Sequence, residues 1–165
     1  MPQPDPWIGR LIASVRRHVV PVIFGERPHP QRPASINLAS GVVVDLGRGP
    51  FLITASHVIN RAREREDELR FHFLVGQSEI PFTLRIVSDS ATLDVATLTL
   101  TRDEASEIEK LGYPIVQPPS WPPPDVNPGA DVIAAGFPAH GRSSTLSIVR
   151  YLRPIPFPRC AGVGG

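Results

Sequence analysis

His57 and Asp94, the candidate pair, are the residues of this chain whose types and positions suit proton-transfer chemistry. His57 follows the apolar, β-prone run Phe51–Thr54, and Asp94 stands directly before another β-prone run. An imidazole changes its protonation near neutral pH, so it can take a proton from a nucleophile. A carboxylate bonded to the other ring nitrogen holds the ring in one tautomer. The pair predicts a general base with its orienting acid; a purely structural hydrogen bond, or a histidine that only caps a strand, is the alternative.

The composition is that of a folded chain without a preference for polyanions. The 165 residues suit one domain, or one medium domain with part of another, and 41% of them are hydrophobic and 20% charged. The formal net charge of +1 gives no reason to expect binding to nucleic acid or to an anionic membrane surface. The 20 prolines predict short strands and structured loops, because proline interrupts helices and central strands.

Cysteine usage and the N-terminal pattern indicate the compartment. Cys160 is the single cysteine, so no internal disulfide can form, and a reducing compartment fits at least as well as a secreted one. The chain starts without a basic region before an apolar core, and basic residues interrupt the apolar run that follows: Arg10, Arg16, Arg17 and His18. This pattern is neither a secretory signal nor a membrane span. We therefore expect a soluble protein of the cytoplasm.

Periodicity predicts a short helix followed by strands. Trp7–Arg17 has its apolar residues near one helical face, which is typical of an amphipathic helix packed on a larger body. Val19–Phe24 is β-prone, and its internal proline predicts an edge strand. Ser35–Asp45 and Phe51–Thr54 are joined by a glycine-rich turn and predict a hairpin that ends next to the histidine of the candidate pair.

Further strands are expected at short, even spacing. Alternating apolar and polar residues predict three of them, namely Phe71–Val75, Phe82–Val87 and Asp94–Leu100. Ser88–Ser90 is interpreted as a polar break, Arg61–Glu68 as a solvated turn or short helix, and Thr101–Gly112 as an exposed helical turn ending at glycine. The spacing predicts a closed or sandwich-like all-β domain over roughly residues 19–101.

A proline-rich stretch divides the chain. Pro118–Pro124 holds five prolines among seven residues, so it is stiff and extended. It predicts a crossing between two subdomains, with a ligand for a proline-recognition module as the alternative. After it, Val132–Pro138 predicts a buried strand ending in a turn, and Thr145–Tyr151 alternates like a further strand.

The segment around His57 resembles the first-barrel strands of trypsin-like serine peptidases. Ala39–Val44, followed by Phe51–Val58, is similar to the strands that precede the catalytic histidine of that family. In the family the histidine follows a strand in a Thr-Ala-Ala-His-like context. Ser56 stands where alanine is commonest, which exchanges one small residue for another.

Two later segments carry the same resemblance in the same order. Leu93–Leu98 resembles the family's Asp-(Ile/Leu/Val)-Ala-x-Leu segment, and Val132–Pro138 resembles the strand and Gly-Phe/Asn-Pro turn early in the second barrel. The resemblance covers roughly residues 19–150. It implies that His57 is the catalytic histidine and Asp94 the aspartate that orients it.

The sequence departs from the family at the nucleophile. The family's serine lies in a Gly-x-Ser-Gly-Gly-like loop well after the Gly-Phe-Pro turn, and the backbone of that loop forms the oxyanion hole. Ser143 and Ser144 lack the glycines behind them and come soon after Pro138, and the residues around Cys160 lack the pattern as well. We expect Cys160 to be an inert thiol and the chain to contain no nucleophile.

The resemblance implies an all-β fold, a trypsin-like double β-barrel with the first barrel complete, the second partial, and a short N-terminal helix. The expected divisions are 1–18 for the helical extension, 19–115 for the first barrel with the candidate pair, 116–128 for the proline-rich crossing and 129–165 for the partial second barrel. The implied function is serine-type hydrolysis of a protein or peptide substrate in a longer parent protein. The alternative is a non-catalytic β-barrel binding module that kept the fold but lost the nucleophile. Exposed edges of an incomplete second barrel favour the first interpretation.

No metal or cofactor site is expected. The remaining histidines show no paired spacing with an acidic partner, so zinc is unsupported: His18, His29, His72 and His140. The glycines at 41, 47 and 49 belong to the predicted hairpin, and no glycine-rich phosphate loop is present. The sequence predicts no particular oligomeric state.

Overall fold

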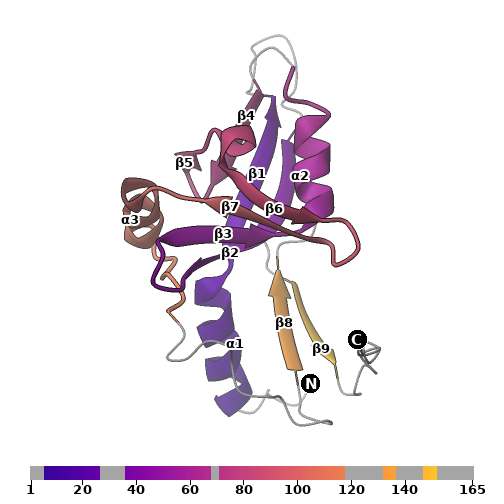
Figure 1. Ribbon diagram of the computed structural model, residues 1–165. Helices are drawn as coiled ribbons and strands as arrows, with labels where there is room; N and C mark the ends of the chain where they lie inside the picture. Colours follow the sequence, from indigo (N-terminus) through magenta and orange to yellow (C-terminus); the bar gives the residue numbers. More distant parts are fainter. Residues whose placement is uncertain (1–5, 27–35, 68–70, 118–131, 137–146, 152–165) are drawn as a thin grey trace, which may run out of the picture.

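A seven-stranded antiparallel sheet forms the body of the protein (Figure 1). The computed structural model describes residues 6–26, 36–67, 71–117, 132–136 and 147–151. The strands of the sheet are β1 (Val20–Glu26), β2 (Ile36–Asp45), β3 (Pro50–Thr54), β4 (Phe71–Val75), β5 (Ser78–Glu79), β6 (Ile86–Ser90) and β7 (Val95–Thr99). They pair in the order β5-β4-β1-β2-β3-β7-β6. The all-β fold is confirmed; closure of the first barrel stays a prediction, because β5 and β6 are the ends of this order.

Four helical segments and a separate hairpin complete the described part of the chain. The helical segments are α1 (Pro6–His18), α2 (Ser56–Arg63), the 3-10 turn η1 (Phe82–Arg85) and α3 (Arg102–Lys110). β8 (Val132–Gly136) and β9 (Ser147–Tyr151) pair antiparallel, and α1 lies alongside β8 (Figure 1). The N-terminal helix and these two strands agree with the sequence predictions. Among the described helices, none is long and apolar enough to cross a membrane.

One hydrophobic core joins the sheet to α2 and α3. Alternate residues of the central strands are buried, as the period of two requires; examples are Val22, Leu52 and Leu98, each with no exposed surface. α2 contributes Val58, Ile59 and Ala62 to the same core, and α3 contributes Ile108. The buried face of α2 therefore fixes that helix on the sheet.

The prediction that Val19–Phe24 is an edge strand is wrong. β1 lies between β4 and β2 and pairs with both. Pro21 is tolerated because the β1–β4 ladder begins only at Val22, and the Pro21 carbonyl accepts from the N–H of Gly76, where β4 turns away, at 2.8 Å. The N–H group that proline lacks would face β4, on the same side as this carbonyl and at the end of the β1–β4 ladder. The pairing of the two strands therefore loses no hydrogen bond.

The predicted strand Phe82–Val87 and the predicted break Ser88–Ser90 are also wrong. Residues 82–85 form η1 after Pro81, with Phe82 buried and Leu84 87% exposed. Ile86–Ser90 is strand β6, which pairs with β7. Polar residues suit this strand because it is at the end of the sheet and much of it faces solvent.

The segment after β7 is a capped helix. The Thr101 side chain accepts from the Glu104 N–H at 3.1 Å, and Glu104 accepts in return from the Thr101 N–H at 2.6 Å, which forms a capping box. The predicted exposed helical turn is thus α3, with Ala105 and Ile108 buried on one face. Gly112 follows with φ +92°, a conformation that favours glycine. Pro118–Pro124 lies outside the described residues, and the division of the chain into four segments stays a prediction.

Candidate active site

The first turn of α2 takes its cap from a distant residue. Ala55 occupies the N-cap position with extended backbone and has no side chain able to accept a hydrogen bond. The first N–H groups of a helix have no partner within the helix. The N–H of His57 donates instead to Asp94 Oδ1 at 2.9 Å. Asp94 therefore does for α2 what an N-cap side chain does in other helices.

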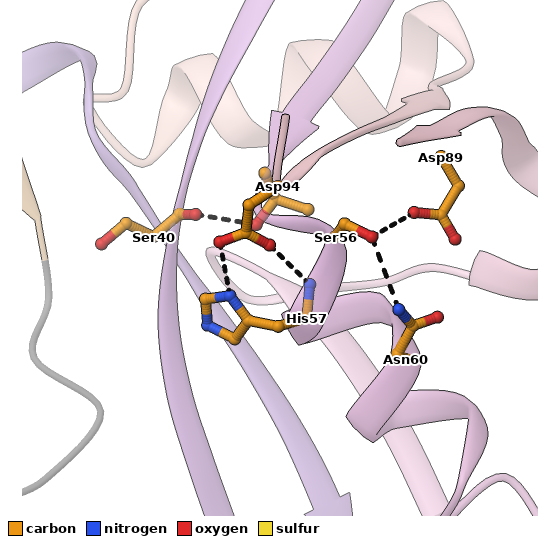
Figure 2. A network of polar contacts seen from close by, with 7 residues as sticks. Ser40, Ser56, His57, Asn60, Asp89 and Asp94 are labelled. Carbon is orange, nitrogen blue, oxygen red and sulfur yellow. Dashed lines mark hydrogen bonds and ion pairs between the residues drawn. The ribbon is translucent and has the colours of Figure 1, made fainter. Parts of the chain in front are cut away.

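The second oxygen of the same carboxylate bonds to the histidine ring. His57 Nδ1 lies 2.8 Å from Asp94 Oδ2, so both carboxylate oxygens bind one residue (Figure 2). A carboxylate only accepts hydrogen bonds, so Nδ1 carries the proton and, in the neutral ring, Nε2 keeps a lone pair. Figure 2 shows the ring nitrogen Nε2 on the side away from Asp94. This is the tautomer that a general base requires.

Both members of the pair are open to solvent. The side chain of His57 is 57% exposed and that of Asp94 is 52% exposed. Nε2 of His57 is therefore accessible to an incoming group. The same exposure lets water compete for the hydrogen bonds, so the geometry depends on how firmly the two backbones are held.

Asp94 has an unusual backbone conformation. Its φ is +50°, and no other non-glycine residue in the described ranges has a positive φ. Aspartate tolerates this left-handed region better than most residues. Asp94 ends the turn 91–94 between β6 and β7, in which the Leu93 N–H donates to Ser90 Oγ at 3.3 Å. The chain enters β7 at the next residue, Val95, so the carboxylate stands at the mouth of that strand as the sequence predicted.

The pKa of the Asp94 carboxyl lies below its usual value. The largest cause is the backbone N–H of His57, followed by the hydrogen bond to the His57 ring; partial desolvation opposes both. The positive end of the α2 dipole acts in the same direction as the hydrogen bonds. Because the folded-state pKa is depressed, the stabilising effect is complete above the ordinary aspartate pKa and is lost as pH falls through the folded-state value.

Replacing His57 by alanine tests which of the two hydrogen bonds from His57 lowers the Asp94 pKa more. We expect the Asp94 pKa, measured by carbon-detected NMR titration of its carboxyl, to rise only part of the way towards an ordinary aspartate in His57→Ala. The backbone N–H bond, which is the larger cause, persists with any residue at position 57 except proline. His18→Ala, a histidine of α1, is the control and should leave the Asp94 pKa unchanged. A complete return to the ordinary value in His57→Ala would contradict the capping role of Asp94.

Two pockets border the pair. The first has a volume of about 310 Å³ and is lined by His57 with residues of β1, β2 and α2: Phe24, Asn37, Leu38, Ala39, Ser40, Ala55, Val58 and Arg61. The second has a volume of about 270 Å³ and is lined by Asp94 with Val19, Ser40, Gly41, Val42, Ile53, Thr54, Ala55 and Val95. His57 thus lines a pocket that opens to solvent, and the charged residue Arg61 of the same helix lines it too.

The structure brings together the two residues that the sequence singled out. The contact of His57 with Asp94 is confirmed, whereas the catalytic role of each stays a prediction. His18 and His72 lie on α1 and β4, and the buried Nδ1 atom of each has no hydrogen-bond partner. Several residues weighed as ligands or nucleophiles lie outside the described residues: His29, His140, Ser143, Ser144 and Cys160. Within the described ranges, no three His, Cys, Asp or Glu side chains are grouped so that they could hold a metal ion.

Sequence reasoning missed how α2 is held at its start. It gave Ser56 no role beyond its small size and interpreted Asp89 as part of a break, yet their side chains are hydrogen-bonded to each other. The available signal was local, because an alanine at the start of a helix leaves the first N–H groups without a cap. Which distant residue supplies the cap is decided by the pairing of β7 with β3.

Comparison with known proteins agrees with the family resemblance of the sequence. Residues 39–155 match the family described as "Trypsin-like peptidase domain", and this range contains both His57 and Asp94. A search among curated proteins found no match. The matched range is more than half of the chain. The chain therefore belongs to the trypsin-like peptidase domain family, which supports a peptidase-type function in general.

Proposed function

We propose that His57 and Asp94 are the histidine and aspartate of a Ser-His-Asp triad that hydrolyses peptide bonds. The observation that carries the proposal is the double contact of Asp94 with the backbone N–H and the Nδ1 atom of His57. In the neutral ring this contact places the proton on Nδ1, so that Nε2 keeps a lone pair that can accept a proton. The serine and the backbone donors of the oxyanion hole come, in this proposal, from residues outside the 165 residues of this chain, because no Gly-x-Ser-Gly-Gly segment occurs in it.

The proposed steps assign each residue a defined task. Nε2 of His57 takes the hydroxyl proton of the serine as the serine oxygen attacks the peptide carbonyl carbon. The Asp94 carboxylate stays ionised and stabilises the imidazolium that forms. His57 then gives the proton to the leaving amine, and a second cycle with water releases the acid and restores the serine. The depressed pKa of Asp94 keeps its carboxylate charged throughout the neutral range.

The substrate in this proposal is a protein or peptide. The pocket that His57 shares with β2 and α2 has about 310 Å³, at the lower end of the range for ligand sites, and suits a side chain near the cleaved bond. Its lining is mostly apolar or neutral, with Arg61 as the exception.

The proposal is tested with a fluorophosphonate probe, which labels only an activated serine. Residues 1–165 should remain unlabelled, whereas a protein expressed with the coding sequence that follows residue 165 should be labelled and should lose the label in His57→Ala. Glu107→Gln, which alters an exposed carboxylate on α3, is the control and should keep the label. Labelling of residues 1–165 would contradict the absence of a nucleophile. A longer protein that stays unlabelled would favour the non-catalytic binding module instead.

A further inference from the structure

A closed ring of four polar side chains lies beside the candidate pair, and Figure 2 shows its members Ser56, Asn60 and Asp89. Ser56 Oγ donates to Asp89 Oδ1, and Asn60 Nδ2 donates to Ser56 Oγ at 3.4 Å. Arg63 Nη1 donates to Asn60 Oδ1 at 3.2 Å and to Asp89 Oδ2 at 2.8 Å. We call Ser56, Asn60, Arg63 and Asp89 the polar ring. Three of its members come from α2 and the fourth from β6, so the ring ties the helix to that strand.

The ring is built to hold one geometry. Ser56, Asn60 and Arg63 are spaced three to four residues apart, so they share one face of the helix. Ser56 is only 1% exposed, and its hydroxyl both donates and accepts within the ring. The Asp89 side chain is 21% exposed and is bonded through both oxygens. The two bonds of Ser56 Oγ are partly buried, and the two bonds of Arg63 are exposed. The Ser56–Asp89 bond is both partly buried and charge-assisted, so it is the strongest of the four.

The turn that carries Asp94 is closed by the pairing of Ser90 with Val95 and by the Leu93–Ser90 hydrogen bond, but its side chains give it little hold on the core. Leu93 is 74% exposed and Val95 is 40% exposed, so neither neighbour of Asp94 anchors it in the core. The turn leaves β6 after Ser90 and enters β7 at Val95. On the β7 side, the pairing of Thr54 with Ala96 fixes the strand next to the start of α2. On the β6 side, the polar ring ties the strand to α2, because its member Asp89 is one residue from the end of β6.

We propose that the polar ring positions Asp94 for its double contact with His57, by fixing the start of α2 against the end of β6. The four members of the polar ring are positioning residues, since none of their side chains is hydrogen-bonded to the imidazole of His57. Opening the polar ring removes the side-chain tie between α2 and β6 and loosens both bonds to the carboxylate, while the buried face of α2 keeps the helix on the sheet. The consequence for catalysis rests on the proposed function; the positioning itself does not.

The test compares two ways of opening the polar ring. Ser56→Ala removes the buried hydroxyl, and Arg63→Ala removes the cation from a residue whose side chain is 42% exposed, so at least the second variant should fold. In both we expect the Asp94 pKa to move upward and hydrogen exchange at the His57 backbone N–H to become at least about fivefold faster, as expected for weakening one hydrogen bond. Arg63→Lys, which keeps the charge, should fall between Arg63→Ala and the unaltered chain.

A matched control separates positioning from general stability. Thr99→Val removes another side-chain hydroxyl, which donates to the Arg85 carbonyl at 3.3 Å at the far end of β7. It should lower the unfolding midpoint without changing the Asp94 pKa or the exchange rate at His57. If Ser56→Ala and Arg63→Ala behave in the same way as Thr99→Val, the polar ring is structural only and the inference is wrong. All these measurements use residues 1–165, so a failure of the triad proposal in the labelling experiment leaves the outcome readable.

Discussion

Replacing Asp94 by asparagine is expected to reverse the tautomer of His57. The backbone N–H of His57 needs an acceptor, so the asparagine amide oxygen takes the place of Oδ1, which receives that bond at 2.9 Å. The amide NH₂ then faces His57 Nδ1 and must donate to it, since two donors cannot share a hydrogen bond. Nδ1 becomes the acceptor, and the ring proton moves to Nε2. The histidine can then no longer take a proton from a nucleophile.

Two measurements check this result. In residues 1–165, nitrogen-15 shifts should report a protonated Nδ1 in the unaltered chain and a protonated Nε2 in Asp94→Asn. In a protein that includes the nucleophile, kcat should fall about 10⁴-fold, the loss that the same tautomer change causes in Ser-His-Asp triads. Asp45→Asn is the matched control, because Asp45 also accepts from two backbone N–H groups, those of Gly47 and Gly49, at the opposite end of the β2–β3 hairpin. An unchanged His57 tautomer in Asp94→Asn would show that the Nδ1 contact does not set the ring proton.

Replacing Phe73 by alanine is expected to lower the free energy of unfolding by a large amount. Phe73 is 1% exposed and stacks on Phe82 with ring centroids 4.8 Å apart, while Phe24 lies on it at 6.2 Å. Removing the ring loses its transfer free energy and leaves a cavity between β1, β4 and η1, which together cost about 3–5 kcal/mol. That is a large fraction of the stability of a typical domain, about 5–15 kcal/mol.

Urea denaturation followed by circular dichroism measures this loss. Phe73→Leu, which keeps much of the volume, should cost less than Phe73→Ala. Leu84→Ala is the control, because Leu84 is 87% exposed and an exposed substitution changes the free energy of unfolding by no more than about 0.5 kcal/mol. A loss below about 1 kcal/mol in Phe73→Ala would mean that the aromatic stack is not part of the cooperative core.

The two substitutions affect different properties of the protein: Phe73→Ala lowers the stability of the sheet, and Asp94→Asn changes the proton position on His57. The aromatic stack and the strands around it determine whether the sheet forms, and the sheet brings β7 next to β3 so that Asp94 can reach α2. The candidate pair itself is more than half exposed and adds little to burial. Its geometry depends on hydrogen bonds, of which the carboxylate supplies two and the polar ring supplies the local tie.

Local patterns in the sequence were sufficient for much of the fold. The amphipathic spacing of Trp7–Arg17 predicted α1, and the glycine-rich turn between two β-prone runs predicted the β2–β3 hairpin. The same patterns failed at Val19–Phe24 and Phe82–Ser90. A proline is excluded from a central strand only if its missing N–H faces a ladder bond, and this depends on where the neighbouring strand ends. Alternation in Phe82–Val87 was compatible with a strand, but Leu84 is 87% exposed in the described part of the chain, so it does not contribute to the apolar face that a strand would need.

The sequence by itself determined the identity of the candidate pair, because residue type and position at strand ends are local properties. It also determined the family, through the order of its segments. Only the tertiary structure decided that Asp94 binds His57 twice, that Ala55 leaves α2 without a cap of its own, and that Asp89 closes a ring with three residues of that helix. These contacts join residues far apart in the chain. Their partners are chosen by strand register and helix placement, which follow from burial of the whole core rather than from any short stretch of sequence.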